Sequence, residues 1–132
     1  MKIIEILMQN ARIPKTEIAK RLGITETAVR KRIAKLEGVV ILGYKAIIDY
    51  KSAGLASSLT GVDVHAEKLW EVVDKFKGIN EIKSIWLTTG DHTIMLEIVA
   101  KSVKDLQIVH DMISKMDGVK RVCPSIILDV LK

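Results

Sequence analysis

Residues 15–37 read KTEIAKRLGITETAVRKRIAKLE, and this stretch decides how the N-terminal part of the chain is organised. Ile18, Ala19 and Leu22 recur at helical spacing and predict a helix with one apolar face. Gly23 ends that helix, because glycine adopts the left-handed conformation without steric cost. Thr25 is a typical N-cap for a second helix that begins after a short turn. The pattern therefore predicts a helix-turn-helix unit.

The second helix has two chemically different sides. Val29, Ile33 and Leu36 share a stripe that predicts its buried face. The opposite side carries small, hydroxyl and basic groups and no carboxylate. The major groove of DNA accepts a slim helix with donors for base edges and phosphates, so we expect this side to bind double-stranded DNA. The expected contacts are Thr25, Thr27, Arg30 and Lys31, with Arg32 and Lys35 nearer the phosphates.

The alternative interpretation is an ordinary solvated helix hairpin, and the distribution of charge separates the two. Residues 1–50 hold ten Lys or Arg and five Asp or Glu, whereas residues 51–132 hold eleven of each. The formal net charge of +5 therefore lies entirely in the helix-turn-helix segment. A localised basic module is expected of a domain that binds a polyanion, because charge that only aids solubility would be spread along the chain.

Composition excludes several other classes of protein. Hydrophobic residues make up 48% of the 132 residues, which is enough for a real core. The apolar runs fall far short of the roughly 20 residues that a membrane span needs, so no membrane association is expected. The single cysteine, Cys123, excludes an internal disulfide framework and fits a reducing cytoplasm. No cofactor is expected.

The segments around the hairpin complete a first domain over residues 1–50. A short helix over residues 2–9 should pack on the hairpin to form a three-helix unit. The β-branched run over residues 39–49 predicts extended structure, a short wing or a hinge strand that links the domains. Residues 50–54 are the expected boundary to a second domain over residues 51–132.

The second domain reads as strand, helix, strand, strand, helix, strand. Strands are expected over residues 59–66, 82–89, 93–100 and 119–131, and a helix over residues 67–77. Ser102 is expected to cap the second helix, and Pro124 predicts an edge strand or a bulge. This order is that of a ferredoxin-like βαββαβ domain. Apolar residues point both ways from the middle strands, with Ile82 and Trp86 expected on one face, so a second copy of the chain should cover the helix-free face.

These residues resemble the Lrp/AsnC family of bacterial and archaeal transcription regulators, and we expect an archaeal member. The resemblance rests on Asn10-Ala11-Arg12-Ile13, on the helix-turn-helix stretch, on Gly43-Tyr44, on Thr89-Gly90-Asp91-His92 and on Gly118-Val119. It implies an α+β protein: an N-terminal winged helix-turn-helix domain followed by a ferredoxin-like sensor domain of the RAM type. It also implies homodimers that assemble into tetramers or octamers and that bind an amino acid between subunits.

The resemblance places the effector at the hairpin between the two middle strands. Thr93 departs from the family pattern, in which an aspartate often ends this hairpin, so the preferred ligand should be polar rather than strongly cationic. The expected effector contacts are Thr88, Thr89, Gly90, Asp91, His92 and Thr93, with Ser125 from the closing strand.

Two other functions remain possible from the sequence. Some tetrapyrrole decarboxylases have a similar two-domain plan, but the three histidines, His65, His92 and His110, show no metal-type spacing. The sensor domain also has a single arginine, which is poor provision for a substrate with several carboxylates, so no enzyme activity is expected. A ligand-sensing oligomer without DNA binding would have a neutral or acidic second helix, unlike the basic one here.

Overall fold

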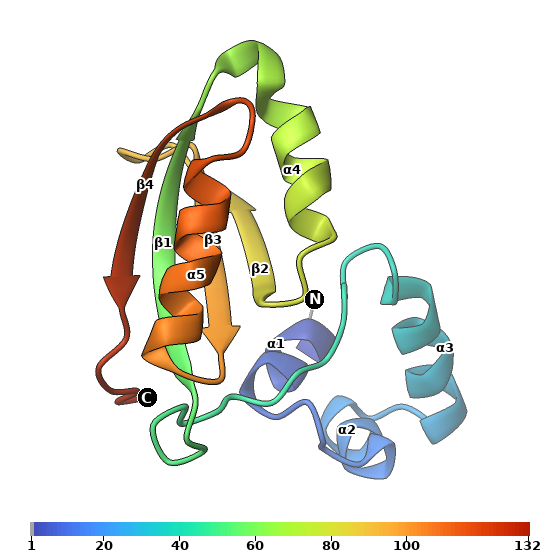
Figure 1. Ribbon diagram of the computed structural model, residues 1–132. Coiled ribbons are helices and arrows are strands. Elements are labelled where there is room, and N and C mark those ends of the chain that lie inside the picture. The colour runs from blue at the N-terminus through green and yellow to red at the C-terminus, as the bar shows by residue number, and fades with distance from the viewer. Residues whose placement is uncertain (1) are drawn as a thin grey trace. The chain divides into compact units, whose positions relative to one another are not determined.

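The computed structural model describes residues 2–132, and the chain divides into two compact units, residues 1–47 and 48–132. The first unit contains three helices, and the second contains a four-stranded sheet with two α-helices (Figure 1). The first unit comprises α1 (Lys2–Gln9), α2 (Lys15–Leu22) and α3 (Glu26–Leu36). The second comprises β1 (Ala56–Val64), η1 (Ala66–Lys68), α4 (Leu69–Lys77), β2 (Ile82–Leu87), β3 (Ile94–Ala100), α5 (Val103–Ser114) and β4 (Val119–Ile126). Over residues 2–132, no helix is both long enough and apolar enough to cross a membrane.

The turn between α2 and α3 has the predicted geometry. Gly23 adopts a left-handed conformation with φ of 65°, and α2 ends there. The Oγ1 atom of Thr25 accepts a hydrogen bond from the N–H of Ala28 at 3.1 Å, which caps α3. The helices pack on one small core, and the helix-turn-helix prediction is confirmed. The buried residues of this core are Ile3, Ile18, Ala19, Val29 and Ile33.

The predicted wing or hinge strand over residues 39–49 is wrong. This segment consists of turns and irregular backbone, and its only pairing is an isolated bridge between Glu37 and Ile41. A strand needs a neighbour for its N–H and C=O groups, and within residues 2–132 no second strand lies beside it. The β-branched composition alone is not enough to form a strand.

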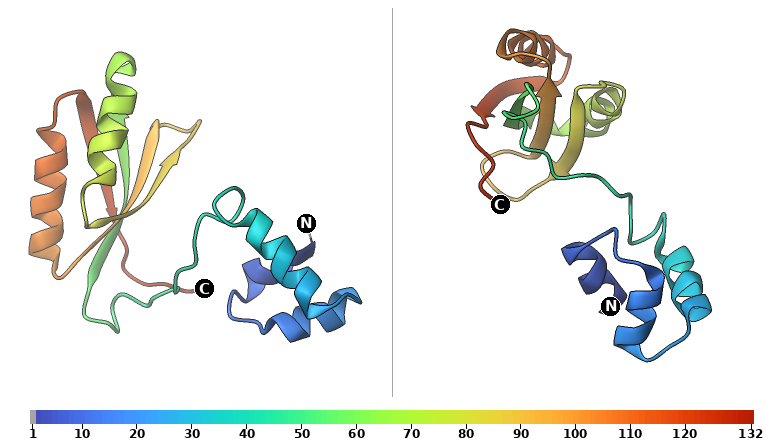
Figure 2. Two further views of the ribbon diagram at one scale, coloured as in Figure 1. Left: turned by 90° about the vertical axis from the view of Figure 1, so that its right-hand side faces the viewer. Right: turned by 90° about the horizontal axis from the view of Figure 1, so that it is seen from below.

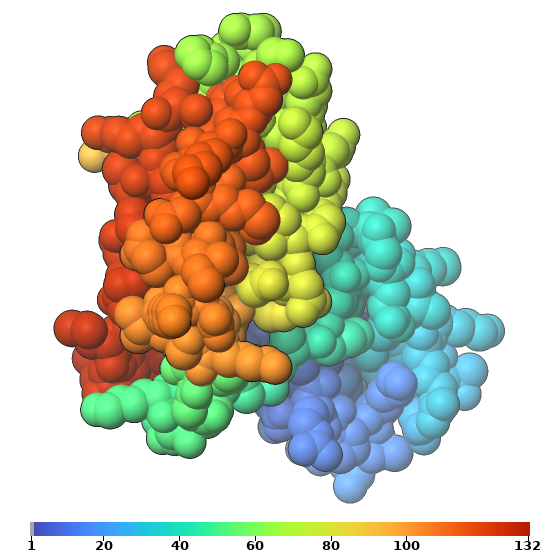
Figure 3. Space-filling view, in the orientation of Figure 1, coloured from blue at the N-terminus to red at the C-terminus, as the bar shows by residue number. Residues whose placement is uncertain are grey.

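The sheet of the second unit is antiparallel throughout, with strand order β2-β3-β1-β4. Both α4 and α5 lie on one face of the sheet (Figure 2), and they cover that face in the space-filling view (Figure 3). This order confirms the ferredoxin-like fold. Pro124 lies on β4, an edge strand, as predicted. The closing strand ends at Ile126 instead of residue 131. Ile126 lies opposite Ser58, and the N–H of Ile127 still donates to the carbonyl oxygen of Ser57 at 2.9 Å, but β1 begins at Ala56 and has almost no residues left to pair with the rest of the segment.

The pairing of β2 with β3 corrects the expected position of Ile82. The register shifts between Ile82, which lies opposite Ile98, and Ser84, which lies opposite Glu97. Ile82 therefore packs against the core under the helices and does not share a face with Trp86. The helix-free face still carries apolar side chains beside polar ones, and Leu59 and Trp86 are 42% and 47% exposed there. We call this surface the open face.

Candidate DNA and ligand sites

The outward side of α3 presents the side chains that the sequence assigned to DNA. Its buried stripe, Val29 and Ile33, faces the core of the first unit. The six predicted contacts are all exposed: Thr25, Thr27, Arg30, Lys31, Arg32 and Lys35. A short, capped helix with donors along its exposed side has the shape and chemistry for a major groove.

One carboxylate lies closer to this surface than the sequence indicated. The Nη2 and Nε atoms of Arg30 donate to Oε1 of Glu26 at 2.6 and 3.2 Å. The description of this side of the helix as free of carboxylates is therefore wrong at its edge. An exposed pair four residues apart is worth only about 0.3–0.5 kcal/mol. Arg30 can exchange Glu26 for a base edge or a phosphate at little cost.

The hairpin between β2 and β3 is closed by its own hydrogen bonds. The N–H of Thr88 donates to the carbonyl oxygen of Thr93 at 2.9 Å, and Oγ1 of Thr88 donates to the carbonyl of His92 at 2.6 Å. Residues 88–91 and Thr93 are exposed. A β-carbon added at Gly90 would meet only Oγ1 of Thr88, at 4.0 Å. The tip of this hairpin is thus open to a ligand.

His92 is the one residue of this hairpin that is partly buried, because its side chain packs on the open face of the sheet. Its Nδ1 atom lies 3.0 Å from Oδ1 of Asp63, and Nε of Arg121 donates to Oδ2 of the same carboxylate at 3.0 Å. The hydrogen bonds from His92 and then from Arg121 hold the pKa of Asp63 below its usual value. The His92 ring also fills the space above Gly61. We call His92, Asp63, Arg121 and Gly61 the hairpin latch.

Sequence reasoning missed the hairpin latch, although a signal was present. Asp63 and Gly61 stand two residues apart on β1, so they share a face with the apolar Leu59. Polar and small residues at such positions indicate that a side chain from elsewhere packs over the strand. A second polar cluster lies on the same face, where the Tyr50 hydroxyl donates to Glu97 at 3.0 Å.

Within one chain, Ser125 does not join the predicted effector contacts. It lies on β4 opposite Leu59, whereas the hairpin follows Leu87, which lies opposite Ile94, and Ile94 in turn lies opposite Val62. Along β1, Ser125 is therefore level with Leu59 and the start of the hairpin is level with Val62. These positions are three residues apart, about 10 Å at 3.4 Å per residue. A ligand that contacts both would have to reach Ser125 of a second copy.

The three histidines lie apart from one another. His65 is exposed immediately before the short 3-10 helix η1, and His92 belongs to the hairpin latch. His110 is buried on α5, where Nε2 lies 3.0 Å from Oγ of Ser58 and 2.9 Å from Oγ1 of Thr60. Burial lowers the pKa of His110. Over residues 2–132, no three His, Cys, Asp or Glu side chains are grouped to hold a metal ion.

Comparison with known proteins finds two family descriptions along the chain. Residues 1–37 match the AsnC-type helix-turn-helix domain, and residues 58–132 match the Lrp/AsnC ligand binding domain. The HTH-type transcriptional regulator LrpA of Pyrococcus horikoshii is 49% identical over 98% of this chain and 94% of its own length. LrpA of Pyrococcus abyssi has the same identity and coverage. The crystal structure of PH0061 has a TM-score of 0.85 at 22% identity, over 100% of this chain and 92% of that one.

Proposed function

Because the chain belongs to the Lrp/AsnC family of transcription regulators, we propose that α3 reads operator DNA and that the hairpin of residues 88–93 binds an amino acid. Membership makes the protein a transcription regulator with a DNA-binding and a ligand-binding domain, and its curated relatives are regulators rather than enzymes. DNA as the partner favours a location in the cytoplasm. The observation that carries the proposal is the exposed basic side of α3 above a buried apolar stripe.

In the DNA-bound state, the N-terminal half of α3 enters the major groove. Thr25, Thr27, Arg30 and Lys31 contact bases, while Arg32 and Lys35 contact phosphates. The test is a gel shift with the upstream DNA of the gene. Replacing both Arg30 and Lys31 by Ala should relax sequence preference and cost roughly 1–3 kcal/mol for each side chain that reads a base. Glu26→Gln is the matched control, since it frees Arg30 and should preserve or strengthen binding. Unchanged affinity of the double variant contradicts the assignment.

Two copies of the chain are proposed to associate through the open face. Leu59 and Trp86 are large apolar side chains exposed on the sheet face opposite α4 and α5. Burying them against a second copy removes this surface from water and presents two α3 helices to DNA. Light scattering on the full chain should give a dimer or a larger assembly, up to a tetramer or octamer. Trp86→Lys should lower the mass, whereas Trp70→Lys, an exposed position on α4, should not.

The proposed effector is a polar amino acid held at a junction between subunits. Its carboxylate meets exposed backbone N–H groups near Gly90, and Asp91 accepts from its ammonium group. Thr88, Thr89, His92 and Thr93 complete the contacts on the hairpin, and Ser125 is contributed by another copy. Calorimetry with the twenty amino acids identifies the ligand. Gly90→Val should abolish binding without unfolding the chain, because a β-carbon there meets nothing closer than 4.0 Å. Binding that survives the valine removes the site from this hairpin.

A further inference from the structure

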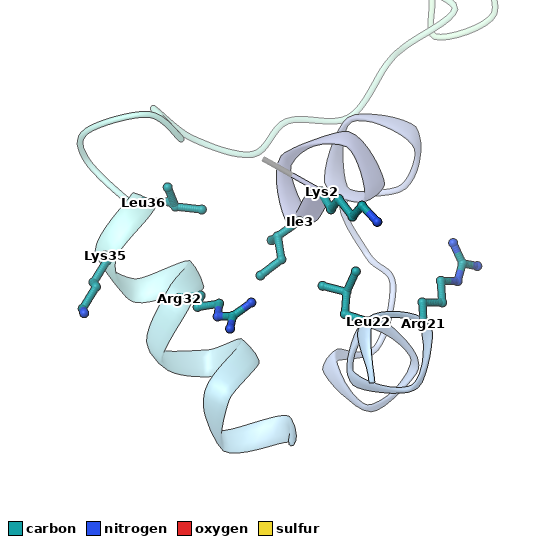
Figure 4. A pocket seen from close by; sticks show the side chains of 7 residues that line it. All are labelled: Lys2, Ile3, Arg21, Leu22, Arg32, Lys35 and Leu36. Carbon is teal, nitrogen blue, oxygen red and sulfur yellow. The ribbon is translucent and has the colours of Figure 1, made fainter. Parts of the chain in front are cut away.

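A cleft of about 540 Å³ opens between the three helices of the first unit. Figure 4 shows Arg32 extending from α3 toward the gap between the helices, with Ile3 of α1 and Leu22 of α2 facing it. Lys2 and Arg21 lie across the gap from Arg32, and the side chain of Lys35 lies at the rim and points away from the cleft. The lining residues are Lys2, Ile3, Arg21, Leu22, Arg32, Lys35 and Leu36.

The charge in this cleft is of one sign. Four of its seven lining residues are basic and none is acidic. Across residues 2–132, no ion pair joins Lys2, Arg32 or Lys35 to a carboxylate, and Arg21 meets Glu17 only at 3.5 Å with both side chains about half exposed. Like charges gathered around one cleft repel each other, so an anion that enters lowers the electrostatic energy of the unit.

The floor of the cleft strengthens this attraction. Ile3 is buried, and Leu22 and Leu36 are half-buried. Apolar walls keep water away from one side of the bound group, and an electrostatic interaction is stronger where the surroundings are less polar. The planar guanidinium of Arg32 can donate two parallel hydrogen bonds to an oxyanion, a geometry that suits phosphate.

We propose that this cleft is an oxyanion site that binds a phosphate group. The phosphate is supplied either by the backbone of DNA or by a free phosphorylated molecule, and only the first source rests on the DNA-binding function proposed above. Arg32 follows Lys31 on α3 and lies about 100° further round the helix. It is therefore on the flank of the outward side, where the wall of a groove carries phosphates.

The first experiment tests for a free anion. Thermal unfolding of the full chain is followed with increasing pyrophosphate at constant ionic strength, for the parent, Arg32→Gln and Lys20→Gln. Lys20 is exposed on α2 next to Arg21 and does not line the cleft, so its variant loses the same charge elsewhere. Pyrophosphate should raise the unfolding temperature of the parent and of Lys20→Gln, and the shift should be absent in Arg32→Gln. No shift in the parent, or equal shifts in all three, overturns the site.

The second experiment identifies the source of the phosphate. If DNA supplies it, Arg32→Gln should weaken binding equally on operator and random duplexes and should reduce the slope of log K against log salt by about 0.9. Pyrophosphate should then compete with DNA. If Arg32→Gln loses the thermal shift but keeps the salt slope, the occupant is a free phosphorylated molecule. A parent that binds no DNA refutes the proposed function alone, because the thermal shift is measured without DNA.

Discussion

The two units of this chain use polar side chains in opposite ways. Residues 2–47 hold their basic groups on the surface, and the ion pair of Arg30 with Glu26 at the proposed DNA surface is solvent-exposed. Residues 48–132 join their polar groups to one another, in the hairpin latch and in the buried contacts of His110 with Ser58 and Thr60. The first arrangement leaves charge available for a partner. The second holds the hairpin of residues 88–93, the proposed ligand site, against the sheet.

The hydrophobic core of the second unit is also larger than that of the first. Among residues 2–132, five buried apolar residues form the core of the first unit and eleven form the core of the second. Small domains bury a smaller fraction of their surface and have less stability to lose. We therefore expect the first unit, the helix-turn-helix unit, to unfold at a lower temperature. The second unit, residues 48–132, which we call the sensor unit, should remain folded at that temperature.

The largest expected effect comes from truncating each core. Phe76→Ala removes a fully buried ring from the sensor unit and should cost about 3–5 kcal/mol, whereas Ile18→Ala should cost the first unit about 2–5 kcal/mol. Scanning calorimetry of the full chain measures both. If the units unfold independently, Phe76→Ala moves the upper transition and Ile18→Ala the lower. A single transition that moves in both variants contradicts the comparison.

The buried His110 should make only the sensor unit sensitive to mild acid. Burial depresses its pKa in the folded state below the ordinary 6.5, so the unfolded chain takes up the proton first. Its contribution to stability is therefore fully present above pH 6.5 and is lost as the pH falls through the depressed pKa, at no more than about 1.4 kcal/mol per pH unit.

Denaturant midpoints of the sensor unit across this pH range test the expectation. His110→Leu should flatten the pH profile, and Ser58 and Thr60 keep each other as partners at 2.8 Å. His65→Gln is the control, because it removes an exposed histidine from the same unit. An equal slope in all three proteins would place the acid sensitivity elsewhere.

Sequence reasoning succeeded where local rules decide the structure. Gly23 and Thr25 fixed the turn, and the alternation of strands and helices gave the topology of the sensor unit. It failed where the outcome depends on a contact between distant segments. The segment over residues 39–49 has the composition of a strand but no neighbour to pair with, and Ile82 changed faces because of a register shift. His110, one turn before Ile113 on the helix, gave no sign of the two hydroxyls it meets.

A smaller effect should come from the two helix caps, one in each unit. The N–H of Ala28 donates to Thr25 and that of Asp105 donates to Ser102, each at 3.1 Å. Thr25→Ala and Ser102→Ala should each cost about 1 kcal/mol. Each should move one calorimetric transition only. The alanine at Thr25 should matter more for DNA affinity, because Thr25 is itself a proposed base contact and also caps the helix that carries the other contacts. Equal DNA affinity in the two variants would contradict both roles of Thr25 in DNA binding.

The smallest change in stability, and the most local, should follow from Gly61→Ala. A β-carbon at Gly61 would overlap the His92 ring, so the ring must leave and Asp63 must lose its hydrogen bond. Arg121 still meets Asp63 from β4, so the sheet should remain folded. The pKa of Asp63 should then rise toward its ordinary value, because its strongest hydrogen bond is gone. Proton titration followed by NMR on the Asp63 carboxyl measures this rise. Gly90→Ala on the same hairpin is the control, since a β-carbon there has room. If the pKa of Asp63 is the same in both variants, the hydrogen bond from His92 does not lower it. The contrast between the two units would then lose one of the polar contacts on which it rests.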